Sequence, residues 1–146
     1  MMGKGDEMVQ DKVDRGDKVE DLRNDKKGKR GVGRILEAYR YSKAGIGAAW
    51  RDEEAFRIVF VLGILFGILG LFVGETWVEK ILLVLPCVLC ITGELINSAI
   101  ENAIDFASLE IHPLAKKAKD MGSAVQFVLL LFFLIVWGSY PFFKLL

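Results

Sequence analysis

Three long apolar stretches, separated by short charged ones, dominate the chain after its first third. Residues 58–74 carry no charge, and a helix of that length extends about 26 Å, nearly enough to cross the hydrocarbon core of a bilayer. A second apolar stretch begins at Ile81 and a third at Ala124. The pattern predicts three transmembrane helices, which we place at residues 55–74, 81–104 and 124–143.

The segment just before the first apolar stretch mixes apolar and charged positions. In "RILEAYRYSKAGIGAAWRDEEAFR", residues 34–57, the apolar side chains form a loosely amphipathic pattern and Trp50 lies near the membrane edge. Both features are typical of an interfacial helix, which we expect at residues 34–52 with a break at Gly45 or Gly47. A solvated linker to the first span is the alternative.

Residues 1–31 are rich in charges and glycine and contain no aromatic side chain. Such a segment cannot bury enough apolar surface to offset the entropy of ordering it. We therefore predict a disordered charged tail at residues 1–31, followed by a membrane domain at residues 32–146.

Composition supports the membrane class. Hydrophobic residues make up 53% of the chain and the mean hydropathy is +0.36, which is too apolar for an ordinary soluble domain of this size. The formal net charge is zero, and we expect no nucleic-acid partner. Basic residues precede the first span and fill the loop before the third, whereas residues 75–80 hold one lysine. The positive-inside rule therefore places the amino terminus in the cytoplasm.

The second apolar stretch ends in an unusual polar segment, "ELINSAIENAID", residues 94–105. At about 100° per residue, five polar side chains fall within one arc of a helix of roughly 100°. They are Glu94, Asn97, Ser98, Glu101 and Asp105. An acid near the membrane costs at least about 2.5 kcal/mol, and like charges four residues apart repel, so we expect a cation here.

Magnesium suits such a site, because Mg²⁺ takes oxygen ligands from carboxylates together with phosphates, and other acids remain free for proton transfer. Alternatively, the acids only reach solvent at a helix end or pair with lysines of a neighbouring subunit. The next loop, "EIHPLAKKAKDMGSA", places Pro113 at a first helical position and three lysines and Asp120 on one short helix. Those lysines suit a phosphorylated ligand or anionic lipid equally well. His112 fits a helix-start or packing role better than a metal ligand, because no second His or Cys stands at ligand spacing.

Other apparent motifs favour packing. Cys87 and Cys90 form a C-x-x-C in the middle of the second span without a charged neighbour, so we expect both thiols to pack. Glycines spaced by three and four along the first span predict close helix contact; they are Gly63, Gly67, Gly70 and Gly74. Pro86 predicts a kink in the second span.

Three motifs, "AAWRDEEAFR", "ELINSAIENAID" and "AKDMGSA", occur in this order with apolar spans between them. They resemble the small bacterial integral-membrane diacylglycerol kinase family, which includes undecaprenol kinases, and the resemblance covers residues 34–137. It implies an all-α homotrimer in the bacterial cytoplasmic (inner) membrane, with three transmembrane helices and an amphipathic surface helix in each chain. It also implies transfer of the ATP γ-phosphate to a lipid hydroxyl, with Mg²⁺ as cofactor.

The resemblance also implies roles for single residues. Glu94 matches the general base, which also meets the lipid, while Glu53 and Glu101 match ligands of the metal and of the ATP phosphates; Asn97 and Asp105 match supporting residues. Further positions that match nucleotide contacts are Arg34, Tyr41, Glu110, Ile111, His112, Lys119 and Asp120. Positions that match the surroundings of the lipid substrate are Ser42, Trp50, Ala55, Phe56, Arg57 and Ser123.

Substrate choice depends on finer features. Val59 stands where the family usually has an acid, "HPLAK" is closer to the undecaprenol kinases, and "KDMGSA" resembles the diacylglycerol kinases. We expect diacylglycerol as the substrate, with undecaprenol as the alternative. A small ion-coupled transporter would also use membrane carboxylates, but nearer the middle of the bilayer. A non-enzymatic membrane adaptor would make the acidic face incidental.

Overall fold

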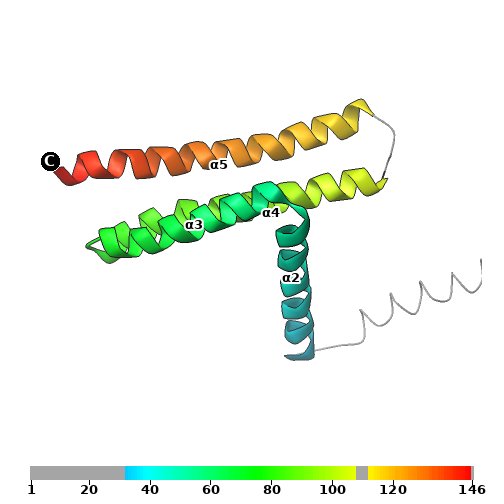
Figure 1. The fold of residues 1–146 in the computed structure, drawn as a ribbon, viewed down its shortest axis with the longest axis horizontal. Coiled ribbons are helices and arrows are strands. Elements are labelled where there is room, and N and C mark those ends of the chain that lie inside the picture. Colours follow the sequence, from blue (N-terminus) through cyan, green and yellow to red (C-terminus); the bar gives the residue numbers. More distant parts are fainter. Residues whose placement is uncertain (1–31, 108–111, 146) are drawn as a thin grey trace, which may run out of the picture. The chain divides into compact units, whose positions relative to one another are not determined.

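The computed structural model describes residues 32–107 and 112–145. Four helices form in these residues: α2 at Val32–Asp52, α3 at Glu54–Val73, α4 at Trp77–Ala107 and α5 at Pro113–Leu145 (Figure 1). Three are long and apolar enough to cross a membrane, at Glu54–Val73, Trp77–Ala107 and Pro113–Lys144. The prediction of an all-helical chain with three apolar spans is therefore confirmed. The predicted tail at residues 1–31 lies outside the described residues.

The chain divides into two compact units, with the boundary between Ala44 and Gly45 in the sequence. The first unit contributes the first part of α2, and the second unit contains the rest of α2 and the three spans. The predicted break in the surface helix is wrong, because α2 is continuous through Gly45 and Gly47. A single glycine lowers helix stability by only about 1 kcal/mol, so neighbouring helix-forming residues can carry the helix across it.

The lysine-rich stretch before the third span is not a separate short helix. α5 continues without a break from Pro113 into the apolar span, since residues 114–121 contain good helix formers such as Leu114, Ala115 and Lys116. His112 starts the helix: its Nδ1 accepts a hydrogen bond from the Leu114 amide at 3.2 Å. Pro113 occupies the first helical position, as predicted, and the helix-start role of His112 is confirmed.

The start of α4 is set by a capping box. The Glu79 amide donates to Thr76 Oγ1 at 3.2 Å, and the Thr76 hydroxyl donates to Glu79 Oε1 at 3.1 Å. Glu79 Oε2 also accepts the Glu75 amide at 2.9 Å. These bonds satisfy amides that have no partner within the helix, and they fix the turn between α3 and α4. α4 then continues through Pro86 to Ala107.

α4 packs against both α3 and α5 (Figure 1). A methyl group added at Gly63 would lie 2.7 Å from Ile91 of α4, and one added at Gly70 would lie 2.9 Å from Leu83. The predicted close helix contact is therefore confirmed at these two glycines, whereas nothing lies within 4 Å of such a group at Gly67. α3 and α5 meet where Phe66 stacks edge-on against Trp137, with ring centroids 5.0 Å apart.

A single non-helical residue, Glu53, joins α2 to α3. It has extended backbone angles, with φ −113° and ψ 110°. Arg57 Nη1 donates to the Trp50 carbonyl at 3.1 Å and to the Arg51 carbonyl at 3.0 Å. Carbonyls at the end of a helix lack partners within the helix, so the guanidinium of Arg57 stabilises this corner. The corner brings the Glu53 side chain to the polar end of α4.

Candidate functional site

The polar end of α4 holds its acidic residues at different depths. Glu94 is only 6% exposed and Ser98 5% exposed, whereas Glu101 is half-buried and Asp105 is exposed. None of the described residues donates a hydrogen bond to the Glu94 carboxylate, so both its oxygens remain free to accept a proton or a hydroxyl group. The buried acid therefore lies within the span, and the other acids extend toward its end.

Two asparagines hold the neighbouring carboxylates. Asn97 Nδ2 donates to Glu101 Oε1 at 2.9 Å, one helical turn away. Asn102 Nδ2 donates to Glu53 Oε1 at 2.8 Å and also to the Ser98 carbonyl at 2.8 Å. The amide of Asn102 thus ties the α2–α3 corner to α4. Each carboxylate keeps one oxygen outside these bonds.

Glu94 and Glu101 lie seven residues apart on one face of α4, and the bond from Asn102 holds Glu53 at the same end of that helix. We call these three residues the carboxylate cluster. None of the three forms an ion pair with a described residue. The structure thus brings together the residues that the resemblance identifies as base and metal ligands.

Asn102 was missed by sequence reasoning. It directly follows Glu101, so it lies about 100° away from the acidic face that drew attention. The sequence does place an amide, Asn102, on the helix face next to the acids, and such an amide can reach a carboxylate on an adjacent element. Its partner could not be identified without knowing that the α2–α3 corner packs against this face.

Predicted supporting and nucleotide-contacting residues lie mainly on α5 and on the exposed end of α4. Lys119 forms an ion pair with Asp105 across the α4–α5 interface. Asp120 pairs with Lys116 at 2.7 Å on the same helix, and both side chains are mostly exposed. Exposed pairs contribute about 0–1 kcal/mol, so Lys119 can leave Asp105 at little cost when a phosphate binds.

The remaining predicted nucleotide contacts are placed as follows. Arg34 and Tyr41 are exposed on α2 in the first unit. Glu110 and Ile111 lie outside the described residues. His112 caps α5, as described above.

The predicted lipid-facing residues gather mostly at the α2–α3 corner. Trp50 stacks edge-on against Phe60 with centroids 5.6 Å apart, and Phe56 contacts the same ring at 5.7 Å. Phe56 is 1% exposed and so belongs to the core of the chain, while Arg57 caps α2. Ala55 and Ser123 are exposed, and Ser42, on α2 in the first unit, donates to the Ala38 carbonyl at 2.9 Å.

The described residues contain no group of three or more His, Cys, Asp or Glu side chains able to hold a metal ion. A metal cage made only of protein is thus not present in this part of the chain. Two carboxylates with free oxygens, on Glu53 and Glu101, match the other common arrangement, in which Mg²⁺ is held by one or two carboxylates together with substrate phosphates.

Comparison with known proteins identifies the family of the chain. The prokaryotic diacylglycerol kinase family matches residues 40–140. A diacylglycerol kinase of Helicobacter pylori is 46% identical over 111 residues, covering 76% of this chain and 87% of that protein. One of Pseudomonas aeruginosa is 44% identical over 113 residues, covering 77% and 92%. One of Escherichia coli is 36% identical over 107 residues, covering 73% and 88%. The chain therefore belongs to the prokaryotic diacylglycerol kinase family.

Proposed function

We propose that this chain transfers the γ-phosphate of ATP to the hydroxyl group of diacylglycerol, giving phosphatidic acid. One observation carries the chemistry: Glu94, a buried carboxylate to which none of the described residues donates a hydrogen bond, shares the polar end of α4 with two carboxylates that accept bonds from neutral amides. Phosphoryl transfer requires positioning and charge neutralisation more than covalent chemistry from the protein, and this cluster supplies both kinds of group.

Glu94 acts as the general base. Its depth in the span suits a lipid hydroxyl, because diacylglycerol arrives within the bilayer and its hydroxyl lies near the polar boundary. A carboxylate that accepts no other hydrogen bond is free to accept the hydroxyl proton as the oxygen attacks phosphorus. Burial excludes water from the same position and so disfavours hydrolysis of ATP.

Glu53 and Glu101 would hold Mg²⁺ together with the ATP phosphates, and the bound metal would neutralise charge on those phosphates. Asn97 and Asn102 fix one oxygen of each carboxylate and orient the other toward the ligand. Lys119, at the start of α5, moves from Asp105 to a phosphate oxygen, while Asn97 and Asp105 keep the end of α4 in place.

We place the chain in the bacterial cytoplasmic membrane with its amino terminus in the cytoplasm, as the distribution of basic residues favours. We further propose a homotrimer with residues 32–146 as the kinase domain and residues 1–31 as a charged tail. Large apolar side chains that are exposed along the spans support the membrane location and leave surface for neighbouring subunits; examples are Leu62, Leu65, Phe127, Leu134 and Ile135.

A lipid-kinase assay tests the proposal. The purified full-length oligomer in mixed micelles receives radiolabelled ATP and Mg²⁺ with diacylglycerol, with undecaprenol, or without a lipid alcohol. We expect label in phosphatidic acid at a higher turnover than in undecaprenyl phosphate. Faster transfer to undecaprenol would replace the substrate, and no transfer to either alcohol by a correctly assembled oligomer would overturn the proposal.

A further inference from the structure

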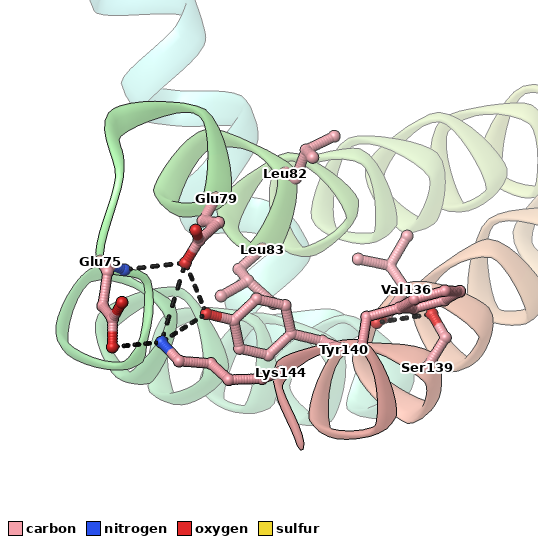
Figure 2. A pocket seen from close by; sticks show the side chains of 9 residues that line it. Glu75, Glu79, Leu82, Leu83, Val136, Ser139, Tyr140 and Lys144 are labelled. Carbon is pink, nitrogen blue, oxygen red and sulfur yellow. Dashed lines mark hydrogen bonds and ion pairs between the residues drawn. The ribbon is translucent and has the colours of Figure 1, made fainter. Parts of the chain in front are cut away.

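A second polar cluster lies at the other end of the bundle, where α4 begins and α5 ends. It surrounds a cavity of about 520 Å³ (Figure 2). Its lining combines the polar side chains of Glu75, Glu79, Tyr140 and Lys144 with apolar side chains including Leu82 and Phe143, which we call the apolar wall. Glu79 and Glu94 are fifteen residues apart on α4, which corresponds to roughly 22 Å along the helix. This outer pocket is therefore separate from the carboxylate cluster.

The two acids of the outer pocket differ in how firmly they are held. Glu79 Oε2 accepts the Tyr140 hydroxyl at 2.8 Å and the Glu75 amide at 2.9 Å, and Glu79 Oε1 is bound by the capping box. Glu75, by contrast, is 76% exposed and its carboxylate is bound through Oε1 to Lys144 at 2.8 Å. Glu79 is thus a fixed part of the fold, and Glu75 is the group that a ligand can reach.

The charges in the pocket do not balance. Among the residues that line the pocket, two carboxylates face the ammonium group of Lys144, which lies 2.8 Å from Glu75 and 3.9 Å from Glu79 Oε2. The ammonium group also donates to the Val73 carbonyl and to the Tyr140 hydroxyl, each at 3.3 Å. A simple cation at Glu75 would have to compete with Lys144. A simple anion at Lys144 would be repelled by both acids. A ligand that carries both charges avoids both problems. Its cation pairs with Glu75 and its anion pairs with Lys144, so the one ion pair between these residues is replaced by two ion pairs to the ligand.

We propose that the outer pocket binds the headgroup of a bilayer phospholipid that carries a primary ammonium group and a phosphate. The ammonium group donates hydrogen bonds to Glu75, and Lys144 turns from Glu75 to the phosphate. The volume of the cavity is in the range of sites that hold small ligands. Leu82 is 50% exposed and Phe143 77% exposed, so the apolar wall offers the acyl chains a surface that a soluble zwitterion would not use.

The pocket favours a primary over a quaternary ammonium group. Carboxylate oxygens accept hydrogen bonds, which a primary ammonium donates and a trimethylated one cannot. Quaternary ammonium groups are instead recognised by cages of several aromatic rings. Here the Lys144 ammonium already lies 5.6 Å from the centroid of the Tyr140 ring, and Phe143 is the other aromatic residue in the lining of the pocket.

Native mass spectrometry of the full-length oligomer tests this proposal. The protein in detergent is titrated with phosphatidylethanolamine, phosphatidylcholine or phosphatidylglycerol of identical acyl chains. Two to three charge-assisted hydrogen bonds distinguish the first lipid from the second, so we expect at least about tenfold tighter binding of phosphatidylethanolamine. Glu75→Gln should bring that ratio close to one, and Lys144→Gln should weaken phosphatidylethanolamine binding.

The matched control is Glu54→Gln, which removes an exposed carboxylate outside the pocket and should leave the ratio unchanged. Equal binding of the two zwitterionic lipids by the unaltered protein would overturn the proposal, as would preference for phosphatidylglycerol. A Glu75→Gln protein that melts earlier but keeps the lipid ratio would also overturn it and would assign the cluster to holding the helix ends together.

Discussion

The two ends of α4 both carry acids but treat them differently. At the carboxylate cluster, Glu53 and Glu101 are bound by neutral amides, and Glu94 accepts no hydrogen bond from the described residues. At the outer pocket, Glu79 accepts hydrogen bonds from the hydroxyls of Tyr140 and Thr76 and from the Glu75 amide, and Lys144 lies at a longer distance. A neutral amide orients a carboxylate without neutralising it, so the first end keeps its negative charge for a ligand. At the second end, hydrogen bonds hold Glu79 within the fold, and Glu75 is the acid that a ligand can reach.

The largest effect is expected at Glu94. Glu94→Gln keeps the shape and polarity of the side chain but removes proton acceptance, so turnover should fall by about 10² or more while MgATP affinity stays nearly unchanged. Lipid-kinase rates and MgATP titrations on a confirmed oligomer measure the two quantities. Turnover close to that of the unaltered protein would exclude Glu94 as the base.

Neutralising the other two acids should affect binding as well as turnover. Glu53→Gln and Glu101→Gln each remove a ligand of Mg²⁺, so both should weaken Mg²⁺-dependent nucleotide binding, and raised Mg²⁺ should partly restore turnover. The check is a MgATP titration at several Mg²⁺ concentrations. If all three glutamine variants lost nucleotide affinity equally, the division between a base and metal ligands would be wrong.

A smaller effect is expected at Asn102, which acts by positioning Glu53. Asn102→Ala leaves both carboxylates in place but frees Glu53, so the apparent Mg²⁺ affinity should fall by about tenfold, as is common when a hydrogen bond to a metal ligand is lost. Thr92→Ala is the control, since the Thr92 hydroxyl donates to the Val88 carbonyl of its own helix and to no other residue in the described part of the chain. If Asn102→Ala showed an unchanged Mg²⁺ dependence, the hydrogen bond from Asn102 to Glu53 would make no contribution to metal binding.

The smallest effect on turnover is expected at the outer end. Tyr140→Phe removes the hydroxyl whose single hydrogen is shared between Glu79 at 2.8 Å and the Val73 carbonyl at 3.2 Å, so stability should fall by about 1 kcal/mol. Turnover should remain unchanged. Thermal unfolding in detergent and the kinase assay provide the two measurements, and a large loss of turnover in a folded protein would show that the two ends are coupled.

The sequence was informative where local pattern decides structure. Apolar runs give the spans, Pro113 marks the start of α5, and helical spacing places Glu94 and Glu101 on one face. Contacts between distant elements were beyond such reasoning. The Asn102–Glu53 bond depends on the corner at Glu53, and Tyr140 meets Glu79 only because α4 and α5 pack in one particular register. Lys144 gave no signal in the sequence, since a lone lysine near a chain end is ordinary.

The corner between α2 and α3 has a mechanical consequence. Glu53 is the one non-helical residue between these two helices, so the same φ and ψ that set the bend also set the direction of a proposed metal-binding carboxylate. Glu53 is thus both the joint between the two helices and a proposed ligand of Mg²⁺. Any change in the angle between α2 and α3 at this joint must therefore also turn the Glu53 carboxylate. A glycine inserted between Asp52 and Glu53 would separate the bend from the direction of that carboxylate.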